Sequence, residues 1–259
     1  MGPSPKTREH ETTIEIPAPV DQVWETITTS AGVQAWCAPK ARIDPQPGGE
    51  YFVSWGEGFD APGKIEVFQP PSHLRVVTER QSTGSSEPGE AAVAAAPVRI
   101  AIDYYLESRE AATVLRLVHS GFLASDDWDR ELEGTRKGWP IMLRIMRYGL
   151  THHPGVEGRQ CWFYLARNTG IQDAWNAVAE SVKGNPIQFS APPEELCATW
   201  NALGDGLVYA AFGQRGGATG ISMNVVLYGD AMKRLPEAAA HWEKELDRVL
   251  APVSTPNGA

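Results

Sequence analysis

Between Trp128 and Leu150 the chain reads WDRELEGTRKGWPIMLRIMRYGL. Residues of one helical face recur here at steps of three and four, and the charged residues fall mostly off that face. The members of this face are Trp128, Leu132, Thr135, Trp139, Met142, Met146 and Leu150. The pattern predicts a long amphipathic helix, which needs another surface to cover its apolar side.

The sequence before this helix predicts a sheet as the covering surface. Alternation of apolar and polar residues begins at Glu11, and a short helix around Trp24 follows it. Further β-rich segments, separated by Gly, Pro and Ser, lie at 51–55, 64–68, 74–79, 98–106 and 113–119. The low-complexity segment 81–96 is interpreted as the tip of a hairpin. Strands followed by one long helix indicate a layered α+β fold.

The rest of the chain repeats this order in a shorter form. A strand at 161–167 precedes a helix at 171–182, and three strands precede a final helix at 231–250. The three strands are expected at 196–202, 207–213 and 220–228. An offset of 96 residues places Leu235-Pro236 on Trp139-Pro140. The sequence therefore predicts two tandem units, the second a shortened and degenerate copy of the first.

The composition excludes several classes of partner. The 259 residues include 23 basic and 32 acidic side chains, which gives a net charge of −9, and no run is rich in Lys or Arg. Nucleic acids and anionic membrane surfaces attract basic patches, so neither is expected as a partner. No segment reaches the roughly 20 apolar residues that a membrane span needs. We expect a cytoplasmic protein.

Motifs for metals and cofactors are also missing from the sequence. Cys37, Cys161 and Cys197 are far apart, as expected for reduced thiols rather than for zinc ligands. The pair His152-His153 precedes Pro and Gly, which is typical of the end of a helix. Neither a GxGxxG motif nor a P-loop is present. We expect no metal and no cofactor.

The direction of side chains in the strands predicts an aromatic cavity. The chain contains nine tryptophans, and aromatic side chains are common in small-molecule sites. Because side chains alternate along a strand, those on the apolar face are expected to point toward the long helix. The predicted cavity wall consists of Trp36, Tyr51, Trp55, Thr78, Tyr104, Leu117, His119, Trp139, Met142 and Met146.

Two interpretations of the polar members of this wall stay open. In the structural one, His119 and the tyrosines are core residues that form hydrogen bonds with the backbone. In the functional one, His119 is a general acid or base near neutral pH, and Tyr51 or Tyr104 donates to an enolate oxygen. The seven other residues of the wall would then contact the ligand.

Six motifs occur in order in the first half of the chain. They are IEIPAPVDQVW at 14–24, AWCAP at 35–39, GGEY at 48–51, GKIEVFQPPSHL at 63–74, HSGF at 119–122 and GWPIML at 138–143. Together they resemble the Hsp90-ATPase-activator-like branch of the START/Bet v 1-like (SRPBCC) superfamily. The resemblance implies a helix-grip fold, in which a curved antiparallel sheet wraps a long helix around a cavity. It implies a helix-grip domain at 8–155. The second half shares only the layout, and the repeated order of elements predicts a smaller α+β domain, a degenerate copy, at 159–252.

The resemblance also implies what the cavity does, because such cavities often take a small hydrophobic molecule. Relatives include lipid carriers, hormone receptors, aromatic polyketide cyclases and co-chaperone domains. The expected function is therefore binding of a small hydrophobic or aromatic ligand, with any turnover being cofactor-independent acid/base chemistry of a polyketide-cyclase-like or lyase type. The alternative is a co-chaperone or stress-type interaction module that works with an Hsp90-type chaperone. The second half would cap the first, form a homodimer face, or be a reduced domain.

Overall fold

The computed structural model describes residues 6–80, 97–215 and 217–250. The chain divides into two compact units, Met1–Gly155 and Val156–Ala259, and each is described by itself. The predicted hairpin tip at 81–96 lies outside the described residues. Both units have the mixed α+β composition that the sequence predicts, with antiparallel sheets and a long helix after the last strand.

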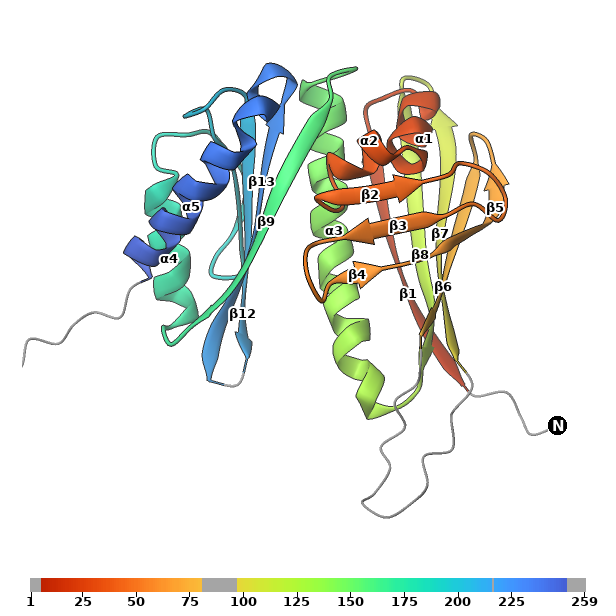
Figure 1. The fold of residues 1–259 in the computed structure, drawn as a ribbon, viewed down its shortest axis with the longest axis horizontal. Coiled ribbons are helices and arrows are strands. Elements are labelled where there is room, and N and C mark those ends of the chain that lie inside the picture. Colours follow the sequence, from red (N-terminus) through yellow and green to blue (C-terminus); the bar gives the residue numbers. More distant parts are fainter. Residues whose placement is uncertain (1–5, 81–96, 216, 251–259) are drawn as a thin grey trace, which may run out of the picture. The chain divides into compact units, whose positions relative to one another are not determined.

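The first unit is built on a five-stranded antiparallel sheet with the order β1-β8-β7-β6-β5. The first strand of the unit, β1, pairs with its last strand, β8, so the two are neighbours in the sheet although they are far apart in the sequence. Helix α3 follows β8 and lies against one face of this sheet (Figure 1). The bounds of these elements are β1 Thr7–Ile16, β5 Lys64–Gln69, β6 His73–Arg80, β7 Val98–Arg109, β8 Ala112–Leu123 and α3 Asp129–His152.

A smaller layer of the first unit connects β1 to β5. Two short helices, α1 and α2, are followed by a three-stranded sheet with the order β2-β3-β4, which lies across the unit in front of the strands of the large sheet (Figure 1). The bounds are α1 Val20–Thr28, α2 Ser30–Gln34, β2 Lys40–Ile43, β3 Tyr51–Ser54 and β4 Asp60–Ala61. Sequence patterns did not predict α2, β2 or β4, because each is five residues or shorter.

A β-bulge in β8 changes which side chains face the core. On the partner strand Arg8 lies opposite Phe122 and the next residue lies opposite Ser120, so Gly121 is the extra residue. Its φ of +98° belongs to the region that favours glycine. Simple alternation from His119 would place residues 121 and 123 inside, whereas the bulge places Phe122 there, with none of its side chain exposed.

The second unit repeats this topology with fewer elements. Its sheet has the order β10-β11-β12-β13-β9, and helices α4 and α5 cover one face of it (Figure 1). Helix α5 buries Ala238, Trp242 and Leu246, which lie four residues apart on one face. The bounds are β9 Gly158–Arg167, α4 Ile171–Ser181, β10 Ile187–Ala191, β11 Glu195–Thr199, β12 Gly206–Arg215, β13 Ala218–Tyr228 and α5 Leu235–Val249.

The two sheets correspond strand by strand. The orders β5-β6-β7-β8-β1 and β10-β11-β12-β13-β9 become the same when β9 is placed on β1 and β13 on β8. At the start of β8 the buried Thr113 hydroxyl donates to the Ala18 carbonyl at 2.8 Å, and at the start of β13 the buried Thr219 hydroxyl donates to the Thr169 carbonyl at 2.6 Å. The second unit is therefore a reduced helix-grip unit, and among its described residues, 156–215 and 217–250, nothing corresponds to α2 or to the β2-β3-β4 sheet.

The offset of 96 residues, which aligned Pro140 with Pro236 in the sequence, does not match the repeat in the structure. Pro140 lies inside α3, whereas Pro236 lies in the first turn of α5. Proline is tolerated in a first turn because its missing N–H has no helical partner there. The two prolines therefore occupy different places in their helices. Topology and the two threonine hydroxyls identify the repeat instead.

Candidate functional site

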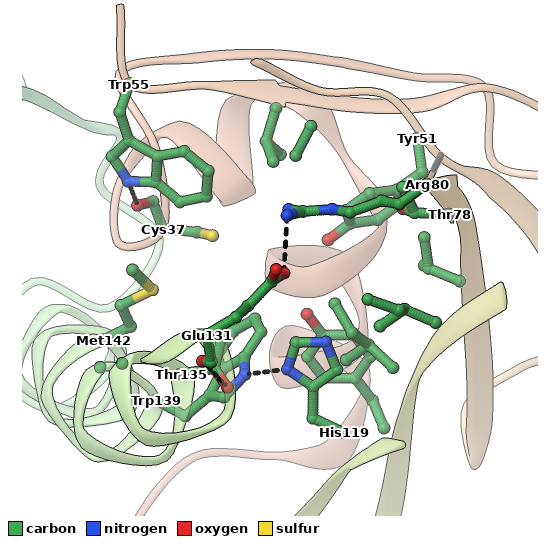
Figure 2. A pocket seen from close by; sticks show the side chains of 18 residues that line it. Cys37, Tyr51, Trp55, Thr78, Arg80, His119, Glu131, Thr135, Trp139 and Met142 are labelled. Carbon is green, nitrogen blue, oxygen red and sulfur yellow. Dashed lines mark hydrogen bonds and ion pairs between the residues drawn. The ribbon is translucent and has the colours of Figure 1, made fainter. Parts of the chain in front are cut away.

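A cavity of about 250 Å³ lies in the first unit between α3 and the two sheets. Side chains from β6, β7 and β8 form one wall, β3 and β4 form a second, and α3 forms the third (Figure 2). The lining residues are Cys37, Tyr51, Val53, Trp55, Ala61, Val76, Thr78, Arg80, Ile100, Ile102, Tyr104, His119, Glu131, Gly134, Thr135, Gly138, Trp139 and Met142.

The helical wall is open because of two glycines one turn apart. Gly134 and Gly138 both line the cavity, and a Cβ atom built on either would meet nothing within 4 Å. Glycine lowers helix stability by roughly 0.8–1.0 kcal/mol relative to alanine. The empty space along this face of α3 therefore exists at the expense of helix stability.

Seven of the ten predicted wall residues line the cavity, and three do not. The seven are Tyr51, Trp55, Thr78, Tyr104, His119, Trp139 and Met142. Trp36 is buried behind the cavity, 6.5 Å from the Trp139 ring, and its indole N–H donates to the Thr26 carbonyl at 3.2 Å. Leu117 and Met146 are buried in the core. They share a face with the lining residues, but neither lines the cavity itself.

His119 is held by a hydrogen bond to an indole. The Nε1–H of Trp139 donates to Nδ1 of His119 at 2.9 Å, and the two rings meet edge to face at 5.9 Å. An imidazole nitrogen that accepts a hydrogen bond carries no proton, so in the neutral ring the proton is on Nε2. Nε2 points away from Trp139 toward the cavity (Figure 2) and has no partner among the described residues. His119 therefore presents an N–H donor to the cavity.

Burial keeps this imidazole neutral. His119 is 6% exposed, and burial, with smaller contributions from the charges of His10 and Arg80, lowers its pKa from 6.5 to about 3. At neutral pH the ring is therefore neither an imidazolium acid nor a base with a free lone pair. The acid/base role that we considered from the sequence stays a hypothesis, and the hydrogen bond from Trp139 favours donation by Nε2–H.

The low pKa of His119 predicts a loss of stability in acid. The unfolded chain takes up a proton as the pH falls below 6.5, while the folded chain resists until about pH 3, so stability declines across that window. At pH 5 the loss from this residue is about 2 kcal/mol relative to pH 7, from 1.36 kcal/mol per pH unit. We expect His119→Gln to reduce this loss in urea unfolding at the two pH values.

A matched control separates this effect from the loss of any histidine. His152 is exposed at the end of α3, and His152→Gln should keep the wild-type difference between pH 7 and pH 5. An identical pH dependence in wild type and His119→Gln would contradict the proposed neutral state of the buried ring.

The two tyrosines of the wall are neutral donors. Tyr51 donates to the Ile27 carbonyl at 3.1 Å, which fits the structural interpretation for this residue. Tyr104 is 1% exposed, and its ring meets Trp139 edge to face at 6.2 Å. Burial raises the pKa of both phenols above the ordinary value of 10, and each phenol affects the pKa of the other. The hydrogen bond between the two phenols raises the pKa of Tyr104 and lowers that of Tyr51, so Tyr104 is the donor and Tyr51 the acceptor.

Cys37 lines the cavity as a thiol. Burial raises its pKa to about 12, so the thiolate that acts as a nucleophile is not populated at neutral pH. The Cys37 carbonyl accepts a hydrogen bond from the Trp55 indole at 2.9 Å, which fixes this tryptophan over the cavity (Figure 2).

Sequence reasoning missed the two charged residues of the site. Arg80 at the end of β6 and Glu131 in the first turn of α3 form an ion pair at 2.7 Å across the cavity (Figure 2). Arg80 has the same strand parity as Thr78, and Glu131 precedes Thr135 by four residues on α3. Parity could have placed both near the cavity, but charged residues are usually assigned to the solvent face.

The described part of the chain gives no sign of a metal site. Within residues 6–80, 97–215 and 217–250, no three His, Cys, Asp or Glu side chains form a group that could hold a metal ion. Within the same ranges, no helix has the length and apolar character needed to cross a membrane.

Comparisons with solved structures give low sequence identity. The protein MLL2253 from Mesorhizobium loti is 20% identical with a TM-score of 0.47, over 56% of this chain and 98% of that one. The di-domain ARO/CYC BexL from the BE-7585A biosynthetic pathway is 12% identical with a TM-score of 0.46, over 96% and 99% of the two chains. DynU16, from the dynemicin biosynthetic locus, is 15% identical with a TM-score of 0.43, over 93% and 97%.

A family model gives a clearer result. No curated protein matches the chain. The model described as "Activator of Hsp90 ATPase homolog 1-like protein" matches residues 17–148. This range runs from the end of β1 to the last turns of α3 and includes every residue that lines the cavity. The chain therefore belongs to the Activator of Hsp90 ATPase homolog 1-like family.

Proposed function

We propose that the first unit binds a small hydrophobic or aromatic molecule in the cavity under α3. The observation that carries the proposal is an apolar cavity into which the unpartnered Nε2–H of a nine-tenths buried histidine points. No described side chain accepts from this N–H, so an acceptor on a ligand in the cavity can do so. Small-molecule sites commonly combine apolar walls with a few orienting polar groups.

The volume limits the size of the ligand. A cavity of 250 Å³ corresponds to about eight water molecules at roughly 30 Å³ each, and it is smaller than the roughly 300–1,000 Å³ of typical ligand sites. A molecule of one or two rings matches this space. Larger polycyclic ligands would require the walls to move.

The polar atoms favour a ligand with a hydrogen-bond acceptor. His119 offers Nε2–H, whereas the hydroxyl of the neutral Tyr104, on the neighbouring strand, already donates to Tyr51. A carbonyl oxygen held by His119 would be polarised, and any turnover would rest on donation to a developing oxyanion. This role replaces proton transfer by His119. If His119→Ala and Tyr104→Phe both left turnover of a bound substrate unchanged, no catalytic role would remain for either residue.

Filling the cavity from α3 tests ligand binding directly. We expect Gly138→Leu to lower the affinity for naphthamide, a neutral two-ring probe, at least ten-fold, because the new side chain occupies the space beside Gly138. Replacing a helical glycine also favours the helix by roughly 0.8 kcal/mol, so loss of binding would not reflect unfolding. Isothermal titration calorimetry measures the affinity, and thermal unfolding measures the stability.

The control adds the same side chain outside the cavity. Lys137 is the preceding residue of α3 and is exposed, so Lys137→Leu should bind naphthamide as the wild type does. Met142→Trp, which fills the cavity from another position, should behave like Gly138→Leu. An interaction module that acts on an Hsp90-type chaperone would instead keep its effect on the chaperone ATPase rate in both filled variants. Absence of binding by every aromatic probe would refute the ligand-binding proposal.

A further inference from the structure

We propose that the ligand of this cavity carries a carboxylate, which pairs with Arg80 in place of Glu131. The inference rests on the proposed function and specifies its ligand class as a small aromatic or hydrophobic acid. The apolar part of the molecule would lie against the aromatic wall, with the acid group at the ion pair.

The ion pair that would be exchanged joins two different elements of the unit. Arg80 is the last residue of β6, and Glu131 comes from the start of α3, so the pair links the sheet to the helix over the cavity (Figure 2). The Arg80 and Glu131 side chains are 47% and 28% exposed. Ion pairs as exposed as this one stabilise a structure only slightly. Breaking one shifts the equilibrium between the paired and unpaired states by at most about five-fold. Glu131 is therefore a partner that a ligand carboxylate can displace.

The described lining holds one cationic partner for an anionic ligand. Arg80 is the one cationic side chain and Glu131 the one carboxylate among the described lining residues. The remaining polar groups include one donor directed into the cavity, Nε2–H of His119. The positive charge of Arg80 is felt inside the cavity, since it contributes to the lowered pKa of His119. Glu131 also lies in the first turn of α3, where the helix dipole favours negative charge.

A second observation points to a bound acceptor rather than to an ion pair that only closes the cavity. His119 is 6% exposed, and its Nε2–H has no partner among the described residues although it points into the cavity. The ion pair leaves this donor unsatisfied. A ligand oxygen that accepts from His119 supplies the acceptor that the described lining does not.

The test compares two probes of nearly the same shape, naphthoate and naphthamide. The wild type should bind naphthoate more tightly, because only the carboxylate pairs with Arg80. Glu131→Gln should raise the naphthoate affinity by up to about five-fold, since Arg80 no longer has a competing partner, and should change the naphthamide affinity less than two-fold. Arg80→Gln should remove the preference for naphthoate. Isothermal titration calorimetry on the full chain gives all affinities.

A control cation lies on the outside of the same helix. Arg136 is 70% exposed and does not line the cavity, so Arg136→Gln should keep the preference for naphthoate. Equal affinities for the two probes in the wild type, unchanged in Glu131→Gln and Arg80→Gln, would overturn the inference while leaving the binding function intact. Absence of binding by both probes would refute the binding function itself. Equal loss of preference in Arg136→Gln would show that overall charge, not Arg80, selects the acid.

Discussion

Replacing Gly121 by alanine is expected to lower the free energy of unfolding of the first unit by about 3–5 kcal/mol. A Cβ atom at this position would lie 2.2 Å from the Arg99 carbonyl oxygen on β7, which cannot move without breaking the sheet. The φ of +98° adds a conformational cost, because residues with a Cβ rarely adopt it. Hydrogen exchange of the β7 and β8 amides measures the effect in this unit alone.

The matched control is a strand glycine without either constraint. Gly213 lies in β12, where a Cβ atom would meet nothing within 4 Å and φ is not positive. We expect Gly213→Ala to change stability by about 0.5 kcal/mol or less. If Gly121→Ala were equally neutral, the bulge would not depend on glycine, and its role in turning Phe122 inward would need another cause.

Trp139→Ala is also expected to have a large effect, lowering the free energy of unfolding by about 3–5 kcal/mol. The indole is 8% exposed, contacts the Tyr104, His119 and Trp36 rings, and donates a hydrogen bond to His119 Nδ1. Its removal leaves a void in the core and a buried acceptor without a donor. Denaturant unfolding of the full chain, followed by hydrogen exchange of the β8 amides, gives the size of the loss.

Trp139→Phe separates the hydrogen bond from the packing. It keeps most of the ring but leaves Nδ1 of His119 unpartnered, which costs about 1–3 kcal/mol. The double variant Trp139→Phe with His119→Phe removes both partners and should cost less than the sum of the single variants. Strict additivity would show that the bond does not hold the histidine in place. Naphthamide affinity should fall in Trp139→Phe, because the donor nitrogen of His119 is no longer fixed.

Periodicity predicted most of the architecture because it reports local geometry. The spacing from Trp128 to Leu150 gave a helix close to the observed Asp129–His152, and alternation put Tyr104 and His119 on the inner face. Alternation gives the direction of a side chain but not its depth. Leu117 and Met146 therefore lie on the predicted face, but they are buried in the core and do not reach the cavity.

The remaining features depend on contacts between distant segments. The Arg80–Glu131 pair joins residues 51 positions apart, and neither sequence neighbourhood indicates the other. The short strands β2 and β4 owe their pairing to β3 rather than to their own composition. The bulge at Gly121 could have been suspected from a glycine inside a strand pattern, but the offset it causes is visible only in the pairing with β1.

Gly134 and Gly138 give the site an unusual kind of adaptability. At most core positions a change of side-chain volume disturbs neighbours, so ligand specificity and folding cannot be altered independently. A Cβ atom at either glycine meets nothing within 4 Å, and the substitution also favours the helix. Descendants of this chain, or designed variants, can therefore reach smaller ligands one methyl group at a time while gaining stability. A substitution at either glycine is therefore expected to change what fits in the cavity rather than to unfold the unit.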